Sequence, residues 1–170
     1  MADLQTVQDG VRFRAPVPED GADIFDLVAA CPPLDQNSMY CNLLQATDFA
    51  DTSVIAELDG VAVGWISGYA PPREPDTLFV WQVAVSQKAR GCGLGKRMLS
   101  HLIDRTGASS LKTTITDDNA ASWALFRSVA KAQGAELSHT PWFRREPHFG
   151  GRHATENLLT IGPLQRSAAA

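Results

Sequence analysis

The sequence has little of what marks a membrane protein, an exported protein or a nucleic-acid-binding protein. No apolar run in its 170 residues approaches the roughly 20 residues that a membrane-spanning helix needs. Its 15 lysines and arginines are outnumbered by 19 acidic residues, whereas nucleic-acid binding usually requires a basic face. The opening residues MADLQTVQDG lack the basic-then-apolar order of a signal peptide. We therefore expect a cytoplasmic protein that binds neither nucleic acid nor membranes.

Cysteine is scarce as well. Cys31, Cys41 and Cys92 are odd in number and have no spacing typical of a metal site, so free thiols are the expected state. His148 and His153 flank a glycine-rich segment, but two histidines without a third fixed ligand do not define a zinc site. We expect no metal cofactor and no catalytic cysteine.

The composition that is present fits a globular α/β protein. Apolar residues make up 44% of the chain and charged residues 20%, and a chain of this length suits one hydrophobic core. We expect a single domain over residues 1–170, with flexible tails at 1–10 and 165–170.

Apolar periodicity predicts an alternation of strands and helices. Strands are predicted over residues 11–17, 53–58, 61–69, 77–85, 111–116, 136–143 and 156–161. Helices are predicted between Asp20 and the prolines at 32–33, and over residues 38–47, 94–106 and 119–133. The resulting order β-α-α-β-β-β-α-β-α-β-β indicates a mixed sheet of about seven strands with helices on both faces.

Some expectations concern individual residues. Asp20 is a candidate N-cap of the first helix, and Gly134 is expected to close the last one. Asp59-Gly60 predicts a tight hairpin turn, because this pair accepts positive φ. The strand over 77–85 is nearly uncharged and is expected to be central. Residues 144–153 read as a loop. In the second helix, Tyr40, Leu43 and Leu44 are expected on one face.

The segment RGCGLGK, residues 90–96, places three glycines between a buried strand and an amphipathic helix. Backbone N–H groups at the start of a helix attract phosphate, and glycine lets the backbone approach a ligand closely. A Walker loop would need Ser or Thr where Arg97 follows Lys96, and a dinucleotide fingerprint would need a third glycine at Lys96. A glycine-rich turn without a ligand is the remaining alternative.

The pattern Arg90-x-x-Gly93-x-Gly95, four residues after the segment FVWQVAVS at 79–86, resembles motif A of the GNAT superfamily of acyl-CoA-dependent N-acyltransferases. The resemblance implies the GNAT fold and acetyl-CoA as cosubstrate. It also implies that loop amides hold the pyrophosphate, while the preceding strand pairs with the pantetheine arm. A downstream helix with Asn119 and Leu125-Phe126 matches the same family. The coenzyme residues implied are Val83, Ala84, Val85, Arg90, Gly91, Cys92, Gly93, Leu94, Gly95, Lys96, Asn119, Ser122 and Phe126.

One position departs from the family pattern. Many GNAT enzymes have a tyrosine at the position of Phe126, where it protonates the departing thiolate, and phenylalanine cannot donate a proton. The acid is therefore another group or water, or none is needed, because thiols titrate near about 8.5.

Four segments are similar to the L-2,4-diaminobutyrate acetyltransferases of ectoine biosynthesis within that superfamily: residues 32–44, 79–85, 114–130 and 148–159. The resemblance implies transfer of acetyl from acetyl-CoA to the 4-amino group of L-2,4-diaminobutyrate, in a ternary complex without an acyl-enzyme. It also implies a homodimer with a role in osmoadaptation. The residues alone reach only an acyl-CoA-dependent amine acyltransferase. A GNAT enzyme for another small amine and a non-catalytic acyl-CoA-binding module stay open.

A doubly cationic acceptor needs anionic and aromatic neighbours, and three residues are the main candidates. Asp35 lies in a proline-bounded loop, with an N-cap role as the alternative. Trp81 could cover a substrate cation, with core packing as the alternative. Glu156 begins the last strand, with a solvated edge charge as the alternative. The lesser candidates are Asn37, Tyr40 and His148.

The expected catalytic residues are Asp35 and Glu156. A primary amine titrates near about 10, so only on the order of one in a thousand is nucleophilic at pH 7, and a proton must be removed before attack. The sequence does not separate the general base from the charge partner. An amide near Val83 is the expected oxyanion donor.

Overall fold

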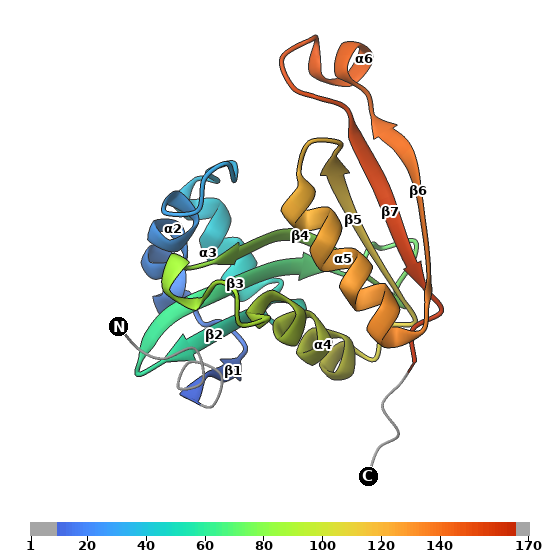
Figure 1. The fold of residues 1–170 in the computed structure, drawn as a ribbon. Coiled ribbons are helices and arrows are strands. Elements are labelled where there is room, and N and C mark those ends of the chain that lie inside the picture. Colours follow the sequence, from blue (N-terminus) through green and yellow to red (C-terminus); the bar gives the residue numbers. More distant parts are fainter. Residues whose placement is uncertain (1–9, 166–170) are drawn as a thin grey trace. The chain divides into compact units, whose positions relative to one another are not determined.

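The computed structural model describes residues 10–165, so the two expected tails lie outside it except for Gly10 and Gln165. The strands are β1 (Arg12–Arg14), β2 (Val54–Leu58), β3 (Val61–Tyr69), β4 (Thr77–Val85), β5 (Ser110–Thr116), β6 (Glu136–Phe143) and β7 (Glu156–Gly162). The helices are α2 (Gly21–Ala29), α3 (Met39–Thr47), α4 (Leu94–Thr106), α5 (Ala120–Gln133) and the short α6 (Arg145–Phe149) (Figure 1). The predicted order of elements is confirmed, with α6 added.

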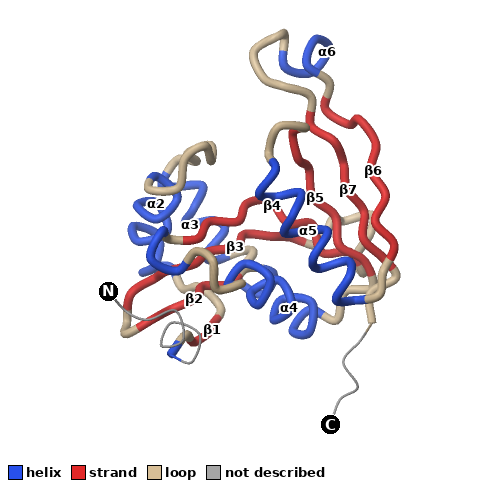
Figure 2. The backbone as a smooth tube through the Cα atoms, in the orientation of Figure 1, coloured by secondary structure: helices blue, strands red, loops and turns tan. Residues whose placement is uncertain are grey.

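The strands form one mixed sheet of seven strands in the order β1-β2-β3-β4-β5-β7-β6. β4 and β5 run parallel, whereas the pairs β1–β2, β2–β3, β5–β7 and β6–β7 are antiparallel. The prediction that residues 77–85 form a central strand is confirmed. Figure 2 shows how strands and helices alternate along the backbone.

The described residues fall into two compact units. The first unit comprises residues 10–69 and 80–106, and the second comprises residues 70–79 and 107–165. The expected single domain stays a prediction, and each unit is described by itself below.

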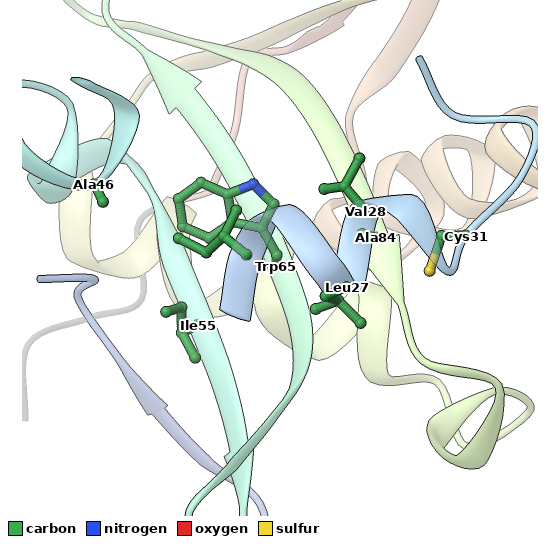
Figure 3. Packing of buried hydrophobic residues seen from close by; sticks show 8 residues of the cluster. Leu27, Val28, Cys31, Ala46, Ile55, Trp65 and Ala84 are labelled. Carbon is green, nitrogen blue, oxygen red and sulfur yellow. The ribbon is translucent and has the colours of Figure 1, made fainter. Parts of the chain in front are cut away.

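The core of the first unit lies between its strands and α2. Trp65 of β3 is fully buried against Leu27 and Val28 of α2 and Ala46 of α3 (Figure 3). The preceding residue, Gly64, faces the opposite side of the strand, and there a Cβ on it would come within 2.8 Å of the Met98 sulfur of α4. The strands of this unit therefore carry α2 on one face and α4 on the other.

Local sequence signals account well for the first unit. The apolar stripe predicted for α4 is buried, as expected: Leu94, Met98, Leu99, Leu102 and Ile103. Asp59 and Gly60 have φ values of 51° and 78°, as the hairpin turn between β2 and β3 requires.

The apolar residues Tyr40, Leu43 and Leu44 do not form the most buried face of α3. The helix buries Asn42, Gln45 and Ala46, while Tyr40 is 69% exposed. Leu43 packs over Gly21 at the start of α2, where a glycine leaves room for it. Gly21 lies 22 residues before Leu43 in the sequence, so periodicity within the helix does not reveal this contact.

Asp20 also differs from expectation. It precedes α2, but its carboxylate makes no hydrogen bond to a helix amide as a cap. Instead it accepts two hydrogen bonds from the Arg14 guanidinium, at 2.7 and 2.8 Å, and one from the Val17 N–H at 2.8 Å. Bidentate, charge-assisted hydrogen bonds are stronger than the hydrogen bond of a neutral cap, so the Asp20 carboxylate binds Arg14 instead of a helix amide.

In the second unit, α5 packs on β6. The Trp123 indole donates a hydrogen bond to the Thr116 carbonyl at 3.1 Å, and its ring meets the edge of His139 at 5.1 Å between centroids. The closure of α5 by Gly134 is confirmed by its φ of 59°. The expected loop at 144–153 contains α6, which ends at Gly150 with a φ of 56°. A helix of only five residues has too little periodicity to be predicted from sequence.

Between residues 10 and 165, we find no helix with both the length and the apolar character needed to cross a bilayer.

Candidate functional site

The glycine-rich segment forms the turn that leads from β4 into α4. Gly91 and Gly93 have φ values of 80° and 71°, a conformation that other residues rarely adopt. The Arg97 N–H donates to the Gly93 carbonyl at 3.1 Å, so Gly93 accepts the first hydrogen bond of the helix. Because the first-turn N–H groups of a helix have no intrahelical acceptor, they are available to an anion. A Cβ on Gly91 or Gly93 would meet no heavy atom within 4 Å, so the backbone here borders open space.

The side chains of this segment point in different directions. Cys92 is buried, and its thiol donates to the Ala89 carbonyl at 3.0 Å. The Arg90 Nε donates to the Val85 carbonyl at 3.1 Å, while Lys96 is exposed. Whatever the loop binds therefore meets main-chain groups and basic side chains rather than the thiol.

The end of β4 precedes this loop. The ladder between β4 and β5 covers Thr77–Phe79 of β4, and among the described residues 83–85 lie outside it. Ala84 is buried, whereas Val83 and Val85 are half-buried. The Val85 carbonyl accepts from both Arg90 and the Cys31 thiol, at 3.1 and 3.3 Å. An extended ligand that hydrogen-bonds to the Val85 carbonyl would therefore compete with Arg90 and Cys31.

The loop between α2 and α3 holds the acceptor candidates of the first unit. The Ser38 hydroxyl accepts from the Cys41 N–H at 3.1 Å, so Ser38 is the cap of α3. Asp35 is exposed, and the alternative role considered for it, an N-cap, is taken by Ser38. Asn37 is half-buried, and Tyr40 stands exposed in the first turn of α3.

Gln82 of β4 joins this loop to the strand. Its Nε2 donates to the Asp35 carbonyl at 2.8 Å, and its Oε1 accepts from the Asn37 Nδ2 at 3.3 Å. Sequence reasoning missed Gln82. The available signal was a neutral polar residue inside an otherwise apolar strand, which usually means that its amide has specific partners.

Trp81 lies beside Gln82 and is 49% exposed, which excludes the core-packing alternative. Its ring meets Tyr69 edge-on at 6.5 Å between centroids, and Tyr69 in turn lies 6.1 Å from Phe49. These aromatic rings form a row in the first unit, with Phe49 and Trp81 exposed and Tyr69 half-buried between them. Gln82 holds Asp35 and Asn37 on its own face of β4, whereas the side chain of Trp81, the preceding residue, points to the other face of the strand.

In the second unit, Asn119 caps α5. Its Oδ1 accepts from the Ser122 N–H at 3.1 Å. Phe126, two turns along the same helix, is 2% exposed and belongs to the packed interior. The roles expected for these three residues toward a coenzyme stay predictions.

Glu156 and the expected loop residues lie at the start of β7 and before it. The Glu156 side chain is 19% exposed, and its Oε1 lies 3.8 Å from the His153 Nε2. A fully solvated edge charge is therefore excluded for Glu156. The His148 Nδ1 accepts from the Arg144 N–H at 2.7 Å, so that this nitrogen stabilises its own turn.

Two alternative chemistries find little support in the described residues. Burial raises the pKa of the Cys41 thiol, which disfavours the thiolate that a nucleophile needs. Within residues 10–165, no three His, Cys, Asp or Glu side chains are grouped as metal ligands would be.

Comparison with known proteins gives consistent relatives. A model of the acetyltransferase (GNAT) family matches residues 22–130. The chain is 47% identical over 158 residues to an L-2,4-diaminobutyric acid acetyltransferase of Methylotuvimicrobium alcaliphilum, covering 91% of this chain and 92% of that protein. It is 49% identical over 156 residues to the protein of that name from Vibrio parahaemolyticus, covering 90% and 86%.

A solved structure is similar over nearly its whole length. It is the diaminobutyrate acetyltransferase EctA of Paenibacillus lautus in complex with L-2,4-diaminobutyric acid and coenzyme A. The TM-score is 0.86 at 37% identity, with 94% of this chain and 98% of that chain covered.

Proposed function

Because the chain belongs to the acetyltransferase (GNAT) family, we propose that it transfers acetyl from acetyl-CoA to the 4-amino group of L-2,4-diaminobutyrate. The observation that carries this proposal is the combination of two features. One is the open turn at Gly91 and Gly93 before α4. The other is similarity over about nine-tenths of the chain to proteins that carry this activity in their names.

The coenzyme site fits the residues present. The first-turn amides of α4 and the basic side chains of Arg90 and Lys96 would hold the pyrophosphate, since both attract anions. The backbone of residues 83–85 would pair with the pantetheine arm, with Val83 better suited than the Val85 carbonyl, which has internal donors. Asn119, Ser122 and Phe126 complete the proposed contacts. Acetyl-CoA supplies the acetyl group as a thioester.

The acceptor site is proposed on the residues that can hold a dicationic amino acid. Asp35 offers a carboxylate on an exposed loop, and Trp81 offers a half-exposed indole ring, of the kind that attracts cations. Glu156 offers a second, half-buried carboxylate beside His153. Asn37, Tyr40 and His148 are further proposed contacts.

The chemistry then rests on proton removal and orientation. Asp35 or Glu156 would take a proton from the 4-ammonium group, directly or through water, since on the order of one amine in a thousand is neutral at pH 7. A backbone amide near Val83 would stabilise the oxyanion. Phe126 can supply no proton to the departing thiolate, so water or another side chain does so if a proton is needed.

The wider setting is proposed on the same resemblance. We propose one GNAT domain for the whole chain, a homodimer, a cytoplasmic location and a role in ectoine biosynthesis and osmoadaptation. The mass of the purified protein in solution tests the dimer, and ectoine production in a host that lacks its own acetyltransferase tests the pathway.

A thiol-release assay tests the activity. The protein is incubated with acetyl-CoA and single amines, and the free thiol of coenzyme A is followed. We expect clear preference for L-2,4-diaminobutyrate over ornithine and lysine. L-2-Aminobutyrate has the same carbon chain without the 4-amino group and is the matched control, with no release expected.

The other outcomes of this assay would replace the proposal. Turnover with other amines alone would make the protein an acetyltransferase for a different small amine. Coenzyme binding without turnover on any amine would make it a binding module.

A further inference from the structure

Gln82 is a buried amide whose two ends both bind the loop between α2 and α3. It is 8% exposed on β4. Its Nε2 donates to the Asp35 carbonyl at 2.8 Å, and its Oε1 accepts from the Asn37 Nδ2 at 3.3 Å. The two partners lie 47 and 45 residues away in the sequence, so these bonds fix a tertiary arrangement.

Packing alone does not account for a glutamine at this position. Burying an amide is costly unless its hydrogen bonds are made, and an apolar side chain would fill the space without that cost. The neighbour on the same face of the strand, Ala84, is apolar and belongs to the core of the first unit. The amide of Gln82 is therefore best explained by its hydrogen bonds to the loop between α2 and α3.

What it holds is the loop that carries two of the proposed acceptor contacts. Binding the Asp35 main chain fixes the loop while leaving the exposed carboxylate out of the bond. Because Gln82 presents an oxygen to Asn37, the Asn37 amide turns its NH₂ toward the strand and its own oxygen away from it. That oxygen is an acceptor of the kind that an ammonium group requires. The Cys31 thiol ties the start of the same loop to the Val85 carbonyl at 3.3 Å.

We propose that Gln82 is a positioning residue that orients Asp35 and Asn37 toward the ammonium groups of the acceptor and thereby sets selectivity for its length. The proposal rests on the proposed function, since it assumes that these two residues bind the acceptor. It concerns the acceptor only, because the amide has no bond to the loop that precedes α4.

The test is Gln82→Met, which keeps the length of the side chain and removes both hydrogen bonds. We expect the KM for L-2,4-diaminobutyrate to rise by about three- to tenfold per lost bond, with kcat changed less and acetyl-CoA affinity unchanged. The ratio of kcat/KM for diaminobutyrate over ornithine should fall, because a loosened loop discriminates less by length. Gln82→Glu is the second variant. It keeps the acceptor toward Asn37 but loses the donor to the Asp35 carbonyl, and we expect the same fall in selectivity.

The matched control is Thr77→Val on the same strand. Thr77 is buried, and its hydroxyl bonds that of Ser110 at 2.8 Å and the Glu74 carboxylate at 3.4 Å, so the change removes partly buried hydrogen bonds elsewhere on β4. We expect lower thermal stability with unchanged acceptor selectivity. Unchanged selectivity in both Gln82 variants, or equal losses for acceptor and coenzyme, would overturn the positioning role. That result leaves the proposed function intact if the wild-type protein acetylates diaminobutyrate, so the two failures are distinguishable.

Discussion

The starts of α4 and α5 are built in opposite ways. At α5, Asn119 closes the helix with its own side chain, which accepts from the Ser122 N–H at 3.1 Å. At α4, the residue that accepts the first helix bond is Gly93, which has no side chain to offer. Both helices follow a strand of the sheet, so position in the fold does not explain the contrast.

Two further helices extend the comparison. Ser38 caps α3 with its hydroxyl, while Asp20 before α2 gives its carboxylate to Arg14 and to the Val17 N–H. At α3 and at α5 a side chain of the protein therefore accepts one first-turn N–H, whereas among the described residues no such side-chain bond is seen at the start of α2 or of α4; at α4 the backbone also borders open space at Gly91 and Gly93. An anionic ligand is the simplest partner for a helix start of that kind.

The largest expected effect comes from filling the open turn before α4. Gly93→Val places a branched side chain where no heavy atom lies within 4 Å and where φ is 71°. We expect acetyl-CoA affinity to fall by about 100-fold or more, roughly 3 kcal/mol, measured by calorimetric titration.

Gly107→Val is the matched control, because Gly107 also has open space around its Cβ position and a φ of 64°. It carries the same backbone strain just after α4, so it should cost stability while coenzyme affinity stays within a factor of about two. Equal losses of affinity in the two variants would mean that strain, and not occupation of the anion site, explains the result.

The second largest expected effect is on kinetics with the acceptor, without a change in coenzyme affinity. Asp35→Asn and Glu156→Gln each remove one negative charge and one candidate base while keeping the shape. We expect kcat/KM for diaminobutyrate to fall by about 100-fold in the variant that lacks the general base, and by less in the other variant. Acetyl-CoA affinity should stay unchanged in both.

Asp59→Asn in the hairpin turn is the control for the charge change, since asparagine also accepts the φ of 51° found there. Wild-type acceptor kinetics in both Asp35→Asn and Glu156→Gln would contradict the proposed acceptor site.

The local features of the fold were largely predictable, because the residues that cause each of them lie close together in the sequence. The Asp59-Gly60 turn, the closure of α5 by Gly134 and the apolar stripe of α4 each depend on residues within a few positions. The glycine turn before α4 belongs to the same class. The identity of the coenzyme was predicted from the resemblance to a family, because no local pattern specifies it.

The features that sequence reasoning missed depend on distant partners. The contact of Leu43 with Gly21 joins two helices, and the role of Gln82 follows from a carbonyl 47 residues away. The two hydrogen bonds between Arg14 and Asp20 join residues only six positions apart, but they require β1 and the turn before α2 to fold back on each other. Periodicity contains no information about such pairs.

A smaller effect compares the two capped helices directly. Asn119→Ala and Ser38→Ala each remove one side-chain cap, and each should lower the free energy of unfolding by about 1 kcal/mol. Only Asn119→Ala should also weaken acetyl-CoA binding, because Asn119 is a proposed coenzyme contact. Denaturant unfolding and coenzyme titration on the same samples check both parts. A loss of coenzyme affinity in Ser38→Ala of the same size would show that the effect is general destabilisation.

The smallest effect concerns Asp20, which precedes α2 without capping it. Burial raises the pKa of its carboxyl, but the hydrogen bonds from Arg14 and the Val17 N–H more than offset this, so the pKa lies below its ordinary value. A carboxyl with a lowered pKa in the folded state stabilises the protein above its unfolded pKa of about 3.9. That contribution is lost as the pH falls through the folded pKa. Asp20→Asn should therefore be less stable than wild type at pH 7, and the difference should shrink as the pH falls below about 4.

Urea unfolding at pH 7, 5, 4 and 3 measures this difference, with Glu19→Gln as the control. Glu19 is the exposed neighbour of Asp20, so the variant makes the same change of net charge without breaking the bonds to Arg14. Glu19→Gln should follow the wild-type curve at each pH. A constant gap between Asp20→Asn and wild type from pH 7 to pH 3 would mean that the carboxylate contributes through its shape and neutral hydrogen bonds. Asp20 would then resemble the neutral caps of α3 and α5, and the contrast between the helix starts would reduce to α4 alone.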